Sequence, residues 1–231
     1  MSNTWTDCNG VLAFDGSPKV TPVVETFFGP FGLRSVEGTW AKEEADAMFV
    51  QQCDEENPSS WEELADGLLR YCETHIYGPM GKLVPDDYQV PELILAIGED
   101  CKADMGALGD LVERIDFATS ALDLLDVFAV VRLINDGHNV KALRLMGGYH
   151  CDRNRLWEFG GFVHYGDAAV SLTLGTHRLL EMTRKLQAGD AEEAIGALVQ
   201  DLLQSIGDDA VRARVADRIR GQAAVIAGAN G

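Results

Sequence analysis

The first forty residues contain several runs of β-branched and aromatic side chains, which are typical of strands. Residues 11–14 are predicted to form one strand, and the Asp-Gly-Ser-Pro segment at 15–18 has the composition of a turn. Residues 20–28 and 31–40 are predicted to form two more strands. Gly29 and Pro30 separate these two runs and indicate a hairpin or a sharp bend.

From residue 41 the apolar positions take the period of a helix. A first helix is expected where five residues fall on one face, namely Ala41, Ala45, Met48, Phe49 and Gln52. A second helix is expected after the break at 57–60, with either Ser60 and Glu63 or Ser59 and Glu62 as its capping box. Its core stripe has i, i+3, i+4 spacing and consists of Trp61, Leu64, Ala65, Leu68, Leu69, Cys72 and Ile76.

Further helices are expected in the rest of the middle segment. Pro91 suits the first turn of a helix that continues through Ile97, and a helical stripe follows over 105–115. Residues 121–134 form the longest apolar stretch of the chain and predict a buried central helix. Ser120 can cap that helix, and Asn135, Asp136 and Gly137 end it.

The last third begins with strand patterns and ends with helical ones. Residues 140–151, 156–165 and 168–174 are predicted to form a three-stranded meander with tight turns at 153–154 and 166–167. Three helices are expected to follow. The first covers 176–186, the second is capped by Asp190, and the third is capped by Asp208 or Asp209.

This order of elements predicts an α+β fold. The N-terminal strands and the C-terminal three-stranded meander are expected to join one antiparallel sheet, packed with about seven helices. We expect a single domain over 1–231. The alternative is a division into an acidic, mostly helical part at 1–137 and a part at 138–231 that holds the meander and three helices.

Composition narrows the class of protein. The start of the chain has neither the basic nor the apolar region of a signal peptide, and the stretch at 121–134 is too short to span a bilayer. The cysteines are odd in number, scattered and without a C-x-x-C pair, which argues against a disulfide framework or a zinc ribbon. They are Cys8, Cys53, Cys72, Cys101 and Cys151. We therefore expect free thiols in a reducing cytoplasm.

Candidate catalytic groups are few. Standard nucleotide-binding, hydrolase and metalloprotease motifs do not occur, and no cofactor or metal is expected. Cys151 follows His150, but neighbours in one strand point to opposite faces, and His164 is expected to lie more than about 20 Å along the meander. Asp123 and Asp126 share a helix face in the most apolar segment, where burial would raise their pKa values. A small-molecule enzyme that uses Cys151 or this aspartate pair is the alternative function.

The distribution of charge carries the main functional prediction. The chain has a formal charge of -18, and residues 1–137 contain 26 acids and 8 bases, whereas residues 138–231 contain 11 of each. The acids concentrate in segments 43–66 and 86–116. Helix faces opposite the apolar stripe would carry carboxylates about one turn apart, as a nucleic-acid backbone carries phosphates. Such a field repels nucleic acid and anionic membranes and attracts basic surfaces.

We therefore predict a non-enzymatic acidic binding protein that occupies a basic, nucleic-acid-binding surface of a partner protein. Its charge distribution is similar to that of mimic-type inhibitors such as anti-restriction and anti-CRISPR proteins. The plainer interpretation is an acidic face that only favours solubility. The predicted partner-binding residues are Glu43, Glu44, Asp54, Glu55, Glu56, Glu62, Glu63, Asp66, Asp86, Asp87, Glu99 and Asp100.

Two further surfaces have alternative interpretations. An exposed sheet face with Trp157, Phe159, Phe162 and Tyr165 would pair two copies, which predicts a structural homodimer as a second alternative. The last helix carries Arg212, Arg214, Arg218 and Arg220. These arginines would form a partner site, or would offset nearby acids and complement a helix C-terminus.

Overall fold

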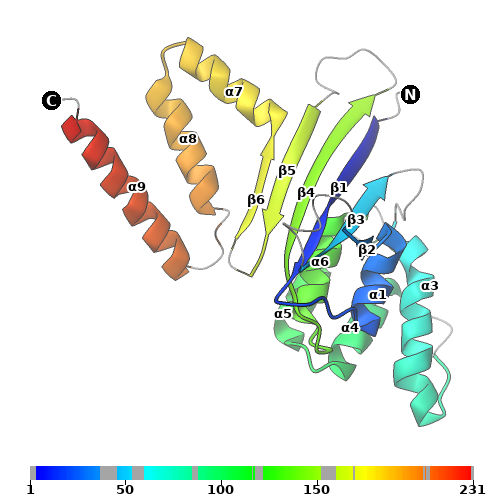
Figure 1. Cartoon of the computed structure of the whole chain (residues 1–231). Helices are drawn as coiled ribbons and strands as arrows, with labels where there is room; N and C mark the ends of the chain where they lie inside the picture. Colours follow the sequence, from blue (N-terminus) through cyan, green and yellow to red (C-terminus); the bar gives the residue numbers. More distant parts are fainter. Residues whose placement is uncertain are drawn as a thin grey trace.

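One six-stranded antiparallel sheet organises the computed structural model, with strand order β2-β3-β1-β4-β5-β6 (Figure 1). The structure describes residues 4–36, 46–53, 60–84, 88–115, 117, 122–151, 160–168, 170–204, 206 and 209–229. The strands are β1 (Thr4–Phe14), β2 (Arg34–Ser35), β3 (Ala47–Cys53), β4 (Val140–Cys151), β5 (Gly160–Gly166) and β6 (Ser171–Gly175).

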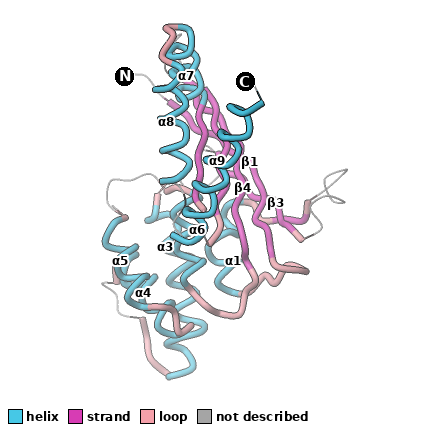
Figure 2. Tube along the Cα trace, turned by 90° about the vertical axis from the view of Figure 1, so that its left-hand side faces the viewer, coloured by secondary structure: helices cyan, strands magenta, loops and turns pink. Residues whose placement is uncertain are grey.

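The described α-helices form two groups. One group covers a single face of the sheet (Figure 2), and it consists of α1 (Pro22–Phe28), α3 (Trp61–Tyr71), α4 (Val90–Asp100), α5 (Met105–Arg114) and α6 (Leu124–Leu133). A π-helical turn (Cys72–Tyr77) extends α3, and short 3-10 turns lie at Gly29–Phe31 and Gly78–Met80. The other group extends beyond the β6 edge (Figure 1) and consists of α7 (Thr176–Gln187), α8 (Ala191–Gln204) and α9 (Asp209–Ala229).

The connectivity explains how both ends of the chain reach one sheet. β1 leads through α1 to β2, β3 pairs antiparallel with β2, and β4 follows after α3 to α6. With the order β2-β3-β1-β4, this is the βαββαβ arrangement of the split βαβ motif, with an enlarged second crossover. β5 and β6 then extend the sheet at the β4 edge. The predicted α+β fold, with N-terminal strands and meander in one sheet, is therefore confirmed.

The hydrophobic core lies between the sheet and the first group of helices. Leu12 of β1 and Leu145 of β4 point from the sheet into it, and the helices contribute side chains that are fully or almost fully buried. Among these are Phe27 of α1, Trp61 and Leu68 of α3, Ile94 of α4 and Val130 of α6. This packing leaves the opposite face of the sheet without a helical cover among the described residues.

The strand predicted at 20–28 is wrong, because Pro22–Phe28 is the helix α1. Thr21 is its N-cap and accepts a hydrogen bond from the Val24 N–H at 3.4 Å, while Pro22 occupies the first turn. A proline with φ near −65° is well suited to that position. The strand predicted at 31–40 shrinks to Arg34–Ser35, and its positions 37–40 lie outside the described residues.

The helix predicted from Ala41 to Gln52 is also wrong in its described part, because Ala47–Cys53 is the strand β3. Met48 packs against the core, whereas Phe49 lines the opposite face of the sheet, as alternation in a strand requires. Ala41 and Ala45 lie outside the described residues. Tertiary pairing with β1 therefore decided the conformation of a segment whose local pattern favours a helix.

The boundaries of the remaining helices agree with the predicted stripes, with one change of cap. Ser60 is the N-cap of α3, since its Oγ accepts from the Glu63 N–H at 3.3 Å. Asp123, rather than Ser120, caps α6, and its Oδ1 accepts from the Leu125 N–H at 2.8 Å. Ser120 itself lies outside the described residues.

The meander is present with a different register. Tyr149 lies opposite Gly160, whereas the predicted two-residue turn at 153–154 would pair Gly160 with Gly147. The observed pairing leaves more residues between the strands, and 152–159 lie outside the described part. A shift of two residues keeps every side chain on its predicted face, because the period of a strand is two.

Candidate functional site

Three of the predicted partner-binding residues lie side by side on α3. Glu62, Glu63 and Asp66 are exposed, because Trp61, Leu64 and Leu68 turn the other side of the helix into the core. Glu62 and Asp66 are four residues apart and so lie about 6 Å apart along the helix axis. The structure thus places these carboxylates on one outward face.

Two more predicted residues, Glu99 and Asp100, form the exposed C-terminal end of α4, which packs against α3. The negative charge of Asp100 helps to raise the pKa of the nearby Cys72 thiol to about 11, although burial of that thiol is the larger cause. The other predicted residues lie outside the described part of the chain, and they are Glu43, Glu44, Asp54, Glu55, Glu56, Asp86 and Asp87.

The described acids differ in whether they form ion pairs with bases of the same chain. Glu62, Asp66, Glu99 and Asp100 take part in none of the ion pairs formed among the described residues. On α7 and α8, in contrast, acids pair with neighbouring bases. Glu193 Oε1 lies 2.7 Å from Lys185 Nζ, and this contact lowers the pKa of Glu193.

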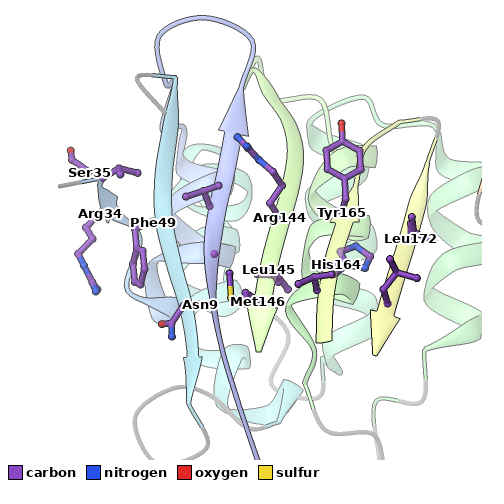
Figure 3. Close-up of a pocket in the computed structure, with 15 residues that line it drawn as sticks. Asn9, Arg34, Ser35, Phe49, Arg144, Leu145, Met146, His164, Tyr165 and Leu172 are labelled. Carbon is purple, nitrogen blue, oxygen red and sulfur yellow. The ribbon is translucent and has the colours of Figure 1, made fainter. Parts of the chain in front are cut away.

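The opposite face of the sheet has a hollow of about 740 Å³ that spans β2 to β6 (Figure 3). Two rows of side chains cross it, because the register aligns alternate residues of neighbouring strands. The first row is Arg34, Phe49, Val11, Arg144, Tyr165 and Leu172, and the second includes Asn9, Met146, Val163 and Leu174.

Arginines are the charged side chains of this hollow, since no carboxylate occurs among its described lining residues. The Arg34 guanidinium lies over the Phe49 ring at 4.2 Å from its centre. It also donates to the Gly32 carbonyl at 3.3 Å and to Gln51 Oε1 at 3.2 Å. Arg144 is half-buried and lies opposite Tyr165 on the neighbouring strand. The hollow therefore combines apolar walls with positive charge.

The Asp123–Asp126 pair lies at the start of α6. Asp123 is exposed and serves as the helix cap, while Asp126 is half-buried in the first turn. Burial, with a smaller contribution from the charge of Asp123, raises the pKa of Asp126. The expected rise therefore occurs at Asp126, and neither residue lines the sheet hollow.

The cysteine and histidine candidates are not brought together among the described side chains. His164 is buried and its Nδ1 lies 2.7 Å from Thr173 Oγ1. It pairs with Leu145, six positions from Cys151 along β4, and the Cys151 side chain is outside the described part.

Cys8, Cys72 and Cys101 are free thiols, as expected. The described residues hold no group of three or more potential metal ligands and no helix able to cross a membrane.

The predicted aromatic dimer face is divided by the sheet. Phe162 packs against the core, whereas Tyr165 lies on the opposite, open face. Trp157 and Phe159 lie outside the described residues. The interpretation of these four aromatics as one exposed face is therefore wrong for the described pair, because positions 162 and 165 differ by an odd number.

The arginines of α9 are partly used within the chain. Arg212 Nε donates to the carbonyls of Leu203 at 3.1 Å and Ile206 at 3.0 Å, at the end of α8. Arg220 Nη2 lies 2.8 Å from Asp217 Oδ1. Arg212 thus complements a helix C-terminus, which was one of the two expected roles.

The sheet hollow was missed in the sequence, although part of its signal is present. Met146, Val163 and Tyr165 alternate with buried residues along β4 and β5, which marks a strand with apolar side chains on both faces. The cross-strand neighbours depend on the sheet order, which the sequence does not supply. Comparison with known proteins adds nothing, since no family model, curated protein or solved structure matches this chain.

Proposed function

We propose that this chain is a non-enzymatic binding protein that occupies a basic, nucleic-acid-binding surface of a partner protein. The acidic side chains of the helical layer would act as a mimic of nucleic acid, as in an anti-restriction or anti-CRISPR inhibitor. The observation that carries the proposal is the set of exposed carboxylates on the adjoining helices α3 and α4. Glu62, Asp66, Glu99 and Asp100 form no ion pair among the described residues.

Electrostatics favours this use of the acidic helices. Acids that form no ion pair among the described residues keep most of their attraction for an external basic surface. The whole excess of -18 lies in residues 1–137, so the field is concentrated on the part of the chain that contains α3 and α4. Complementary charge of this kind mainly accelerates encounter and selects the partner. The same field disfavours direct binding to nucleic acid or to an anionic membrane.

The proposal also places the protein in the cytoplasm and treats its described cysteines as unreactive. Free thiols at Cys8, Cys72 and Cys101 suit a reducing cytoplasm. The raised pKa of Cys72, about 11, keeps that thiol protonated and makes it a poor nucleophile.

The test is competition between this protein and DNA for DNA-binding proteins. A panel with a restriction endonuclease, an RNA-guided nuclease and a basic architectural DNA-binding protein is titrated at about 0.05 M and 0.2 M salt, because exposed charges are screened over this range. We expect displacement of DNA from at least one member, weakened at the higher salt. The absence of displacement from every member at low salt would overturn the proposal.

A matched pair of variants shows whether the acidic helix is responsible. Glu62→Lys with Glu63→Lys reverses two charges in the first turn of α3, and Glu192→Lys with Glu193→Lys makes the same change in the first turn of α8. Both double variants change the net charge and the charge at the helix N-terminus equally, and the α8 variant also breaks the Glu193–Lys185 ion pair. We expect only the α3 variant to lose displacement. Equal loss in both, or none in either, would mean that the acids of α3 serve solubility alone.

A further inference from the structure

The face of the sheet opposite the acidic helices holds an unexplained concentration of exposed apolar side chains. Met146 is 63% exposed and Val163 is 47% exposed, although both lie in the interior of the sheet on β4 and β5. Tyr165, beside them, is 39% exposed. Leaving such side chains in water forgoes about 25 cal/mol for each Å² that a bound group would cover.

The hollow over these residues has the size of a small-molecule site. Its volume of about 740 Å³ falls within the range of roughly 300–1,000 Å³ that is typical of ligand pockets. The six strands supply a rigid floor (Figure 3), because each is hydrogen-bonded to its neighbours in the sheet. A ligand would therefore meet a surface that is largely pre-formed.

The charge of the hollow is opposite to that of the molecule. Arg34 and Arg144 line it, and none of its described lining residues is an acid, although the chain carries -18. The Arg34 guanidinium is oriented by the Phe49 ring and by acceptors on Gly32 and Gln51. A guanidinium has five N–H donors, so these contacts leave Arg34 able to donate to a ligand as well. Its planar donors match a carboxylate well.

We propose that this sheet face binds a small amphipathic anion, with an apolar body over Met146 and Val163 and a carboxylate or similar group held by Arg144, while Arg34 adds positive charge to the same hollow. A polyanion such as nucleic acid is disfavoured here, because the acidic charge of the whole chain repels it over a longer range than two arginines attract it. This binding site is independent of the acidic helices and of their proposed partner.

The test compares two probes that share one apolar body. 4-Phenylbutanoate and 4-phenylbutan-1-ol have the same ring and chain and differ in the anionic group. We expect the carboxylate to bind with a millimolar or tighter Kd and at least about tenfold more tightly than the alcohol, as hydrogen bonds to charged groups allow. Titration calorimetry with the full chain measures both affinities.

Variants locate the site. Arg144→Met removes the charge and keeps a long apolar stem, so the carboxylate and the alcohol should then bind within about threefold of each other. Arg70→Met, on α3 in the helical layer, is the matched control and should retain the tenfold preference. Val163→Glu places an acid in the hollow and should abolish carboxylate binding.

The possible results separate clearly. Equal affinity of the natural chain for the two probes, or no saturable binding of 4-phenylbutanoate up to about 10 mM, would overturn the proposal, because an apolar cleft with a guanidinium must discriminate at this level. A preference that survives both Arg144→Met and Val163→Glu would place the site elsewhere and would also overturn it. If Arg144→Met fails to fold, the two-probe comparison and the exposed Val163 position still decide.

Discussion

Charge reversal at the end of α4 should raise stability and lower partner binding at the same time. Glu99 and Asp100 are the last two residues of α4, where the carbonyl ends of the helix carry partial negative charge. Two acids at that end are unfavourable for the helix. The double variant Glu99→Lys with Asp100→Lys replaces this repulsion by attraction and reduces the net negative charge by four units.

The expected gain follows from the local contacts. A charge in the last turn is worth about 0.3–1 kcal/mol. Here the carbonyls of Ile97, Gly98 and Glu99 already accept backbone hydrogen bonds, at 3.0, 2.8 and 3.1 Å. These bonds neutralise part of the negative end, so we place the gain for both changes together at the upper end of the range for one, about 1 kcal/mol. For a chain of this size that corresponds to a rise in Tm of about 2–4 °C.

The assay measures Tm by differential scanning calorimetry and partner binding by the DNA competition described above. Raising salt to about 1 M should reduce the stability gain, because an exposed charge–dipole interaction is screened. Binding should fall although stability rises. A variant that loses both would show that the acids are structural, and one that keeps full binding would show that these carboxylates do not contact the partner.

Two further changes test the fold itself. Lys102 has a φ of 56°, a backbone conformation that only glycine adopts without cost. Lys102→Gly should therefore stabilise the chain by about 1 kcal/mol. An unchanged or lower urea midpoint of unfolding would contradict this. Burial lowers the pKa of His164 below its usual value of 6.5, so the native state favours the neutral ring. The free energy of unfolding that this preference contributes is complete above pH 6.5 and is lost as the pH falls below that value. His164→Gln should therefore reduce the slope with which the free energy of unfolding falls between about pH 7 and 5.5, by up to about 1.4 kcal/mol per pH unit. Equal slopes in the natural chain and the variant would show that His164 is not responsible.

The elements predicted best from the sequence are those whose cap residue and apolar stripe both lie within the element itself. Ser60 and the regular stripe from Trp61 to Leu68 identified α3, including its cap, because both signals lie within a few residues of each other. At 20–28 the same kind of signal was present in Thr21 and Pro22. The β-branched and aromatic residues that follow suit a strand equally well, and the prediction gave them more weight.

The two functional surfaces also differ in how far local sequence signals predict them. The exposure of Glu62 and Asp66 followed from the stripe on their own helix, so it was predictable. The hollow with Arg34 and Arg144 depends on residues from all six strands, and a long insertion separates β3 from β4. Periodicity identifies which face a residue takes, but it does not reveal which distant strand lies beside it.

The position of β1 has a consequence for the synthesis of the chain. β1 is synthesised before the other described strands, yet it occupies an inner position of the sheet between β3 and β4. β3 follows by residue 53, whereas β4 ends at residue 151, roughly a hundred residues later. At about 5–20 residues per second, one edge of the nascent β1–β3 pair stays open for roughly 5–20 s. During that interval its unpaired N–H and C=O groups are a template for pairing with another chain. A ribosome-bound chaperone that covers this edge until β4 is made would therefore reduce aggregation during translation.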